Sequence, residues 1–430
     1  MAAATTQTTR SRATTEPTAK AKPKPPVEYS ILYTAMLCLL AGGAVMVYSA
    51  SSAEALIQQG DAAYYLKRYL MLAAVGLVAL HFISKHDLRR LKALTPAVVL
   101  VAFALTFAVM LPGIGVTVNG ATRWLGAGPL QFQPSELLKF ALILYAAQLL
   151  ATRPAQLETL GGLVKPLGIV VGLACALLMK QPDMGTALVV CFSIGALLIA
   201  AGVPMRHLGI ILGVLVVLAA ILAVAEPYRR ARLMSFADPW QDAGGAGFQA
   251  VQSMIAIGSG GFFGVGLGES VQKVFYLPEA HTDMILAIVG EELGVLGISV
   301  LASLYGMIGY AGFRTAKLAR DRYSTLLAAG VTSLILAQAC LNFFAVMGLA
   351  PLTGVPLPFV SYGNSNLIVM LGGMGLLLNV AAHGGLPVRK ELRSVDGGAG
   401  RERRAADRDS RRRDSGARGA GAGHRRRAAG

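Results

Sequence analysis

Apolar residues come in long runs along most of this chain. Each run holds about the 20 residues that an α-helix needs to cross a bilayer. The runs recur at about 30–53, 64–84, 94–112, 135–151, 164–179, 184–201, 207–226, 283–312, 324–348 and 363–383. The pattern therefore predicts an all-α polytopic membrane protein with about ten transmembrane helices, and the even number places both termini on one side.

The charges of the short loops predict the orientation. With the N-terminus in the cytoplasm, the inner connections carry the clustered Lys and Arg residues, as the positive-inside rule requires. The outer connections are then 54–63, 113–134, 180–183, 227–282 and 349–362. We therefore expect both termini to be cytoplasmic and the largest extracytoplasmic loop to lie between helices 7 and 8.

Composition excludes a soluble enzyme, because 54% of the 430 residues are hydrophobic and only 14% are charged. The net charge of +16 is concentrated at the ends of the chain: five Lys or Arg against two acids in residues 1–28, and fourteen against six from residue 383 onward. We expect a disordered N-terminal tail (1–28), a transmembrane domain (29–383) and a disordered basic C-terminal tail (384–430). Basic tails near an anionic leaflet explain the charge without a nucleic-acid partner.

Several familiar sites are missing from the sequence. There is no Walker loop, no G-x-S-x-G elbow and no His or Cys cluster with metal-ligand spacing. The run G-G-F-F-G-V-G-L-G does not follow a strand, so a dinucleotide fingerprint is rejected and flexible backbone over a cavity is expected. The cysteines lie inside apolar runs, and we expect no disulfide among Cys38, Cys175, Cys191 and Cys340.

Ionisable residues gather between residues 276 and 294, where the chain is otherwise short of charge: Glu279, His281, Asp283, Glu291 and Glu292. Thr282 is a predicted N-cap, and Asp283 then opens a membrane-entering helix. On that helix Glu291 would lie about 80° around and roughly 12 Å deeper, with Glu292 on the opposite side. An ionisable group in a spanning segment costs about 2.5–3.5 kcal/mol, which makes it a functional candidate. Asp283 as a simple complement to the helix dipole is an equally open interpretation.

Other outer connections also carry unusual polar residues. Pro134 suits the first turn of a helix, and Trp124 suits the membrane interface. Glu136 and Lys139 stand three apart, which predicts either an internal ion pair or, with Arg123, cations for an anionic ligand.

The 180–186 turn and the 342–367 segment complete the set of unusual outer residues. Asp183 is favoured as a helix cap. Prolines 351, 356 and 358 prevent a continuous helix, so this is a re-entrant or loop segment that must line protein or water rather than lipid. Its polar residues are expected to line the same cavity: Ser361, Asn364, Ser365 and Asn366.

Five motifs stand in order along residues 30–383: N-G-A-T-R-W-L, Q-P-S-E-L-L-K, Q-P-D-M-G-T, P-E-A-H-T-D-M-I-L-A-I-V-G-E-E-L-G and P-L-P-F-V-S-Y-G. Together they resemble the SEDS family of peptidoglycan glycosyltransferases, and the division-type members more than the elongation-type members. The resemblance implies polymerisation of lipid II into β-1,4 glycan strands in the bacterial cytoplasmic membrane, at the division septum. One departure is that Asn364, Ser365 and Asn366 follow Ser-Tyr-Gly, where the family usually has Gly-Ser-Ser or similar.

The resemblance also implies roles for residues and partners. Asp283 would be the general base on the acceptor hydroxyl, and Arg123, Lys139 or Lys273 would stabilise the pyrophosphate, with Mg²⁺ or Mn²⁺ as a candidate cofactor. The wider expected substrate-binding set is Arg123, Trp124, Glu136, Lys139, Asp183, Lys273, Glu279, His281, Glu291, Ser361 and Ser365. Expected partners are a class B penicillin-binding transpeptidase and other division proteins.

Two other functions compete with this interpretation. Buried charges and broken helices also suit a transporter or a flippase of lipid-linked precursors, although no internal sequence repeat supports alternating access. A non-catalytic scaffold would explain the charged tails but not acids that line a cavity. Polymerisation of lipid II by the purified protein, compared with translocation in sealed vesicles, separates these functions.

Overall fold

The computed structural model describes residues 25–384, with gaps at 119, 128–129, 155–158 and 226. The predicted tails 1–28 and 384–430 therefore lie almost entirely outside the described residues.

All ten predicted apolar runs coincide with helices. They are α1 (Val27–Gln59), α2 (Tyr64–Lys85), α3 (Leu88–Ala108), α4 (Pro134–Thr152), the continuous α5 (Leu160–Leu163), η2 (Val164–Gly168) and α6 (Ile169–Lys180), then α7 (Met184–Ala200), α8 (Met205–Ala225), α11 (Ile285–Leu318), α12 (Arg322–Val346) and α13 (Asn364–Gly384). Eight of these segments are long and apolar enough to cross a membrane, while Met184–Ala200 and Met205–Ile221 are shorter apolar helices. The helical membrane fold is confirmed, and the number of ten spans stays a prediction.

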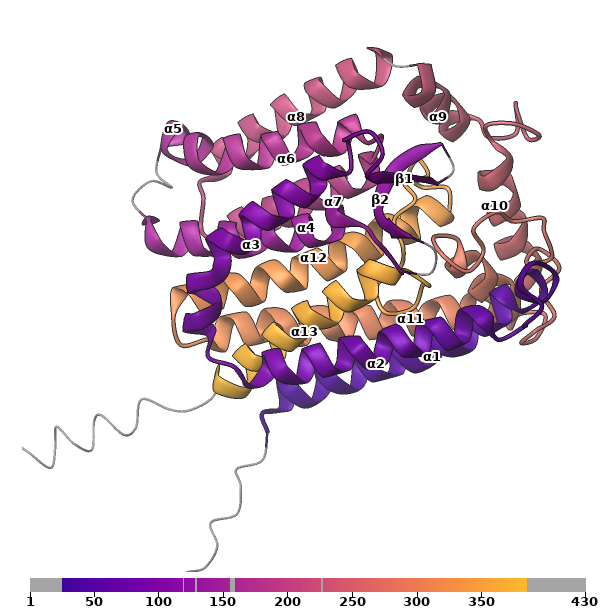
Figure 1. Ribbon diagram of the computed structural model, residues 1–430, viewed down its shortest axis with the longest axis horizontal. Coiled ribbons are helices and arrows are strands. Elements are labelled where there is room, and N and C mark those ends of the chain that lie inside the picture. Colours follow the sequence, from indigo (N-terminus) through magenta and orange to yellow (C-terminus); the bar gives the residue numbers. More distant parts are fainter. Residues whose placement is uncertain (1–24, 119, 128–129, 155–158, 226, 385–430) are drawn as a thin grey trace, which may run out of the picture.

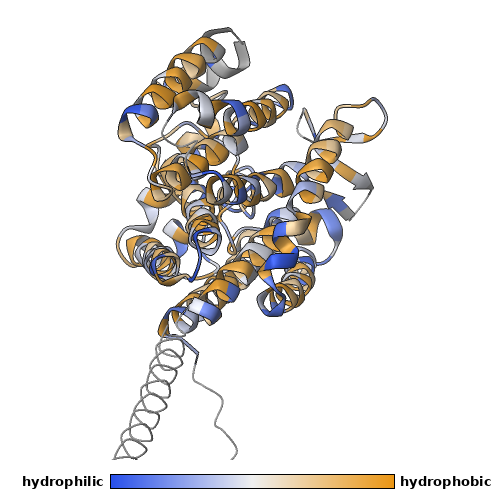
Figure 2. Ribbon diagram, turned by 90° about the vertical axis from the view of Figure 1, so that its left-hand side faces the viewer, coloured by the Kyte–Doolittle hydropathy of each residue, from blue (hydrophilic) through white to orange (hydrophobic). Residues whose placement is uncertain are grey.

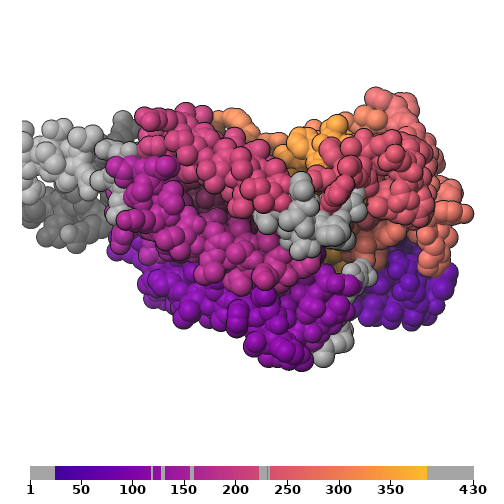
Figure 3. Space-filling view, turned by 90° about the horizontal axis from the view of Figure 1, so that it is seen from above, coloured from indigo at the N-terminus to yellow at the C-terminus, as the bar shows by residue number. Residues whose placement is uncertain are grey.

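The helices form one bundle with α12 near its middle (Figure 1). The helix α2 packs along α13, and α1 packs along α11. Apolar residues run along the helices and polar residues gather near their ends, as Figure 2 shows. In the space-filling view α8 and α9 lie across one face of the molecule (Figure 3), where α8 contacts only α7 and α9 to any extent. Many exposed side chains on these helices are large and apolar, which suits contact with lipid.

The two predicted sets of loops separate to opposite ends of the bundle. At one end, Asn379 Nδ2 donates to the carbonyls of Ile83 (2.9 Å) and His86 (2.6 Å), so α13 ends beside the α2–α3 connection. At the other end, on the right of Figure 1, lie the small sheet and α10. Which of these ends faces the cytoplasm stays a prediction.

The 113–134 loop is more regular than predicted. It forms a three-stranded antiparallel sheet of β1 (Gly115–Val118), β2 (Ala121–Ala127) and β3 (Leu130–Phe132). Gly120 has a φ of 76° in the tight β1–β2 connection, a conformation that favours glycine. The sequence analysis did not identify these three strands, because they are short and contain or adjoin glycines.

The 227–282 loop contains two helices, α9 (Pro227–Ala237) and α10 (Phe248–Gly260), and α10 packs along α11. Its glycine run, residues 260–268, forms backbone hydrogen bonds with α11 where that helix is broken. At Gly294 the backbone leaves helical geometry, with a φ of 66° and a ψ of −164°. The backbone amide of Val265 donates to the carbonyl of Glu291 at 2.9 Å, and that of Gly266 donates to Glu292 at 3.1 Å.

Close packing explains why these positions are glycines. A Cβ at Gly264 would collide with the carbonyl of Glu292, and a Cβ at Gly294 would lie 2.5 Å from the amide nitrogen of Gly264. On the other side of the break, the amide of Val295 donates to the carbonyl of Gly261 at 3.0 Å. The expectation of flexible backbone over a cavity was wrong, since the run satisfies hydrogen-bonding groups that the break in α11 leaves open.

We expect Gly264→Ala to destabilise the protein more than Gly268→Ala. Both glycines have a left-handed φ, 83° and 86°, so both substitutions lose roughly 1–2 kcal/mol from backbone strain. Only the methyl group at 264 also meets packed backbone, whereas nothing lies within 4 Å of a Cβ at 268. Thermal unfolding of the two purified variants checks this, and equal midpoints would contradict the packing argument.

Candidate active site

Asp283 lies in a turn two residues before α11, and not in the first turn of that helix. The helix begins at Ile285, and its N-cap is Met284 without a side-chain hydrogen bond. The prediction of Thr282 as N-cap was wrong because the chain folds through a local turn instead. Glu279 has a φ of 57°, and its carbonyl accepts from the amides of Thr282 (3.1 Å) and Met284 (3.2 Å).

The half-buried Asp283 borders the re-entrant segment. A Cβ on Gly354 would lie 3.5 Å from Asp283 Oδ2. The hydroxyl of Thr282 lies 2.7 Å from Glu279 Oε2 and 3.2 Å from Asp283 Oδ1, so it connects two carboxylates. The backbone carbonyl of Asp283 accepts from Asn342 Nδ2 at 2.7 Å.

His281 is buried among aromatic rings beside this turn. Its ring centroid lies 4.3 Å from that of Tyr65 and 5.7 Å from that of Tyr362, and Nδ1 lies 3.6 Å from Glu54 Oε2. Burial lowers the pKa of His281, against the opposing charges of Glu54 and Glu279, so the ring is neutral at pH 7. Its carbonyl accepts from the amide of Tyr362 at 3.0 Å, which joins this turn to the re-entrant segment.

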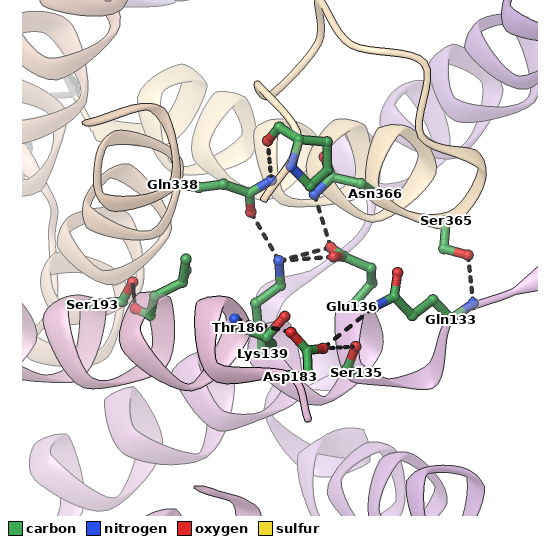
Figure 4. Close-up of polar contacts among 12 residues, drawn as sticks. Gln133, Ser135, Glu136, Lys139, Asp183, Thr186, Ser193, Gln338, Ser365 and Asn366 are labelled. Carbon is green, nitrogen blue, oxygen red and sulfur yellow. Dashed lines mark hydrogen bonds and ion pairs between the residues drawn. The ribbon is translucent and has the colours of Figure 1, made fainter. Parts of the chain in front are cut away.

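Glu136 and Lys139 form a buried ion pair, shown in Figure 4. Lys139 Nζ lies 2.9 Å from the Glu136 carboxylate and 2.9 Å from Gln338 Oε1, and the side chain of Lys139 is 1% exposed. Asn366 Nδ2 donates to Glu136 Oε2 at 2.9 Å. Of the two predicted alternatives, the structure therefore shows the internal pair, and this cation is already neutralised.

Asp183 caps α7, as its position before Met184 predicted. Its Oδ1 accepts from the amide of Thr186 at 3.2 Å. Its Oδ2 accepts from Ser135 Oγ at 3.2 Å, which holds α7 against the start of α4 (Figure 4).

The two serines of the predicted cavity accept hydrogen bonds from backbone amides. Ser361 Oγ accepts from the amide of Leu357 at 2.8 Å, inside the re-entrant segment. Ser365 Oγ accepts from the amide of Gln133 at 2.7 Å, which ties α13 to the start of α4.

The acids in α11 bind the preceding loop and do not extend the site of Asp283. Glu292 pairs with Lys273 at 2.8 Å and accepts from Ser49 Oγ of α1 at 2.7 Å. Glu291 accepts from the amide of Val271 at 3.0 Å and from the hydroxyl of Ser270. The loop before Asp283 therefore contacts both acids, and its Lys273 is neutralised by Glu292. The predicted placement of Glu292 opposite Asp283 stays a prediction.

Arg123 lies on β2, at the end of the bundle that carries the small sheet. Its Nε donates to the carbonyl of Gln181 at 2.9 Å, and its Nη2 donates to that of Pro182. These described partners are neutral. Its neighbour Trp124 is half-buried on β2 and pairs with Val116.

The sequence and the fold of this chain are similar to those of known proteins. A family profile described as "Cell cycle protein", which covers FtsW, RodA and SpoVE, matches residues 29–385. The chain belongs to the FtsW/RodA/SpoVE family. It is 39% identical to Stage V sporulation protein E of Bacillus subtilis (strain 168), over 82% of this chain and 96% of that protein. It is 42% identical to a probable peptidoglycan glycosyltransferase FtsW of Geobacter sp. (strain M18), over 79% of this chain and 92% of that protein.

Solved structures of the family agree with the fold. One is a chain of a peptidoglycan synthase complex, whose structure concerns the coordination of polymerization and crosslinking. It superposes with a TM-score of 0.68 at 31% identity, over 83% of this chain and 98% of that chain. The rod shape determining protein RodA of Thermus thermophilus superposes with a TM-score of 0.60 at 28% identity, over 83% and 97%. The predicted SEDS family is confirmed.

Two amides of α12 were missed by the sequence analysis. Gln338 Nε2 donates to the carbonyl of Pro356 at 2.8 Å, and Asn342 Nδ2 donates to that of Val355 at 2.8 Å. They stand four residues apart in a largely apolar helix, so they share one face. That spacing could have identified the two amides from the sequence. Their hydrogen-bond partners could not be predicted, because helix periodicity says nothing about contacts with another segment of the chain.

The described residues do not form a protein-only metal centre, since no group of three His, Cys, Asp or Glu side chains among them is placed to hold an ion. The carboxylates of Glu279 and Asp283, which both lie within hydrogen-bond distance of the Thr282 hydroxyl, could offer oxygen ligands to an ion that a substrate also binds.

We expect Lys139→Met to cost about 3–5 kcal/mol, because it leaves the Glu136 carboxylate buried and unpaired. The double variant Glu136→Leu with Lys139→Met removes both charges and should recover most of that loss. Lys67→Met is the matched control, since the Lys67–Asp61 pair is exposed and solvent screens it, so its loss should change stability much less than the loss of Lys139. Denaturant or thermal unfolding measures all three, and a double variant no more stable than the single one would contradict the explanation.

Proposed function

We propose that this protein is a peptidoglycan glycosyltransferase that joins lipid II units into β-1,4 glycan strands in the bacterial cytoplasmic membrane during division. Family membership and the relatives named as glycosyltransferases support the activity. The observation that carries the mechanism is the position of Asp283: a half-buried carboxylate at the outer end of the bundle, against the re-entrant segment.

The reaction needs a base and a stabilised leaving group. Asp283 takes the proton from the acceptor 4-hydroxyl as its oxygen attacks the anomeric carbon of the lipid-linked donor. The bond from that carbon to the pyrophosphate breaks, and the undecaprenyl pyrophosphate leaves with the electron pair. A single displacement inverts an α-linked donor into a β bond, so no enzyme nucleophile is needed.

Arg123 is the best candidate for the leaving pyrophosphate. Lys139 and Lys273 are each held by a buried carboxylate, whereas the described partners of Arg123 are neutral carbonyls. A bound Mg²⁺ or Mn²⁺ would supply further charge neutralisation, held by Glu279 and by pyrophosphate oxygens. Such mixed coordination suits Mg²⁺, which usually binds one or two carboxylates plus substrate phosphates.

We expect Asp283→Asn to abolish polymerisation while leaving the fold intact. The amide keeps the size of the side chain and its backbone contacts but cannot accept the proton. Loss of a general base typically lowers the rate about 10²–10⁴-fold. Gel analysis of strands made from labelled lipid II at saturating substrate measures the effect.

Asp61→Asn is the matched control, because Asp61 is an acid on another predicted outer connection and forms an exposed ion pair with Lys67. It should polymerise lipid II at the wild-type rate. Near wild-type activity of Asp283→Asn would remove Asp283 as the base, and lipid translocation in sealed vesicles without any polymerisation would favour the flippase.

We further propose a class B penicillin-binding transpeptidase as the partner, as the family resemblance implies, and this partner would crosslink the strands outside the membrane. The loop before Asp283 presents exposed apolar side chains that a partner ectodomain could cover: Phe263, Val271, Val274 and Phe275. The same loop binds Glu291 and Glu292 of α11, the helix that follows Asp283. A partner that contacts this loop would favour one arrangement of the loop and α11, and so raise the fraction of protein in which Asp283 is competent to react.

We expect Val271→Asp to reduce stimulation by the transpeptidase while the basal polymerisation rate stays near wild type. The Val271 side chain is 63% exposed, so a charge there disturbs docking more than folding. Ile57→Asp, at a 69% exposed position near the outer end of α1, is the control. Polymerisation is measured with the transpeptidase serine blocked, and an equal loss of basal and stimulated rates would exclude this loop as the coupling element.

A further inference from the structure

Asn342 joins two segments that meet at the candidate active site. Its amide nitrogen donates to the carbonyl of Asp283 at 2.7 Å and to the carbonyl of Val355 at 2.8 Å. The side chain is 2% exposed and comes from α12, which is buried along most of its length. One buried amide group therefore fixes the Asp283 turn relative to the re-entrant segment.

The orientation of this amide is determined by its partners. Both Asp283 and Val355 present carbonyl oxygens, which only accept, so the amide must direct its nitrogen toward them. Its Oδ1 is then left buried without a hydrogen-bond partner, and so is Thr353 Oγ1 in the segment that Asn342 holds. A buried amide with an unsatisfied oxygen costs free energy, which a purely structural contact would not need.

The Asp283 turn depends on such an external support. Asp283 precedes α11, which begins at Ile285, so its carbonyl lies in the turn before the helix. Gly354, between Thr353 and Val355, has a φ of 64° and approaches the Asp283 carboxylate. Moving Val355 away from Asp283 would therefore change the space beside the carboxylate.

We propose that Asn342 is a positioning residue, which places the Asp283 carboxylate for catalysis by holding its backbone carbonyl against the Val355 segment. This inference rests on the proposed role of Asp283 as the base. Displacement of a catalytic group by about 1 Å can lower the rate about 100-fold. Because Asn342 holds backbone and does not bind lipid II, its loss should lower kcat and leave KM nearly unchanged.

Two variants distinguish positioning from packing. Asn342→Leu keeps the branched shape but has no donor, whereas Asn342→Ser keeps one hydroxyl donor and leaves a cavity. Positioning predicts the kcat order Asn, Ser, Leu, with Leu about 100-fold below wild type and KM within about two-fold. A packing role predicts the reverse order for the variants, with Leu near wild type and Ser lower in both stability and activity.

The assay uses the full-length purified protein and labelled lipid II over a range of concentrations, with and without a serine-blocked transpeptidase partner. Ser333→Ala is the control, because Ser333 is a buried residue of the same helix whose hydroxyl has no hydrogen-bond partner. It should keep wild-type kcat and KM. If Asn342→Leu does not yield folded protein, Asn342→Ser carries the test through its separation of kcat from KM.

Failure of the two proposals can be told apart. If Asp283→Asn is inactive and Asn342→Leu matches Ser333→Ala, the positioning role is wrong and the base assignment stands. If Asp283→Asn is active, the base assignment is wrong, and with it the positioning role. In an inactive Asp283→Asn background, Asn342→Leu should produce no further loss, since there is no base left to position.

Discussion

The structure depends on satisfying backbone that is not helical inside a helical membrane bundle. Such backbone has no water to bind in a bilayer, so the protein must supply its partners. The re-entrant segment 349–362 receives them from side chains of the surrounding helices. The carbonyls of Val355, Pro356, Pro358 and Phe359 accept from Asn342, Gln338, Tyr305 and Tyr69 respectively.

A second break follows the same rule with backbone donors. At Gly294 the helix α11 opens, and the amides of the glycine run donate to the carbonyls that the break exposes. Side-chain donors were not needed here, because glycines allow two backbones to approach without a Cβ between them. The loop that hydrogen-bonds to this break also carries Lys273, so the same loop both packs against α11 and neutralises Glu292.

Buried charge follows an equally strict constraint. An isolated charge in a low-dielectric interior is far too costly, so Lys139 and Lys273 are each held at under 3 Å from a carboxylate. Arg123 and Asp283 stand apart from these pairs, toward the outer end of the bundle. The proposed chemistry uses Arg123 because its described partners are neutral carbonyls, and Asp283 because its carboxylate borders the re-entrant segment.

The sequence by itself determined the long apolar helices, because long apolar runs leave little choice of structure in a bilayer, but it did not determine the two helices of the 227–282 loop. It also determined the family, through motifs in order, and the local cap at Asp183. Only the tertiary structure decided which charges are neutralised, since Lys273 and Glu292 meet across a loop that periodicity does not describe. It also showed that Asp283 precedes its helix. The hydrogen bond from Asn342 to Asp283 was likewise visible only in the tertiary structure, because it joins residues 59 positions apart. Contacts at that separation depend on how the helices pack, and the apolar pattern specifies helices far better than it specifies their neighbours.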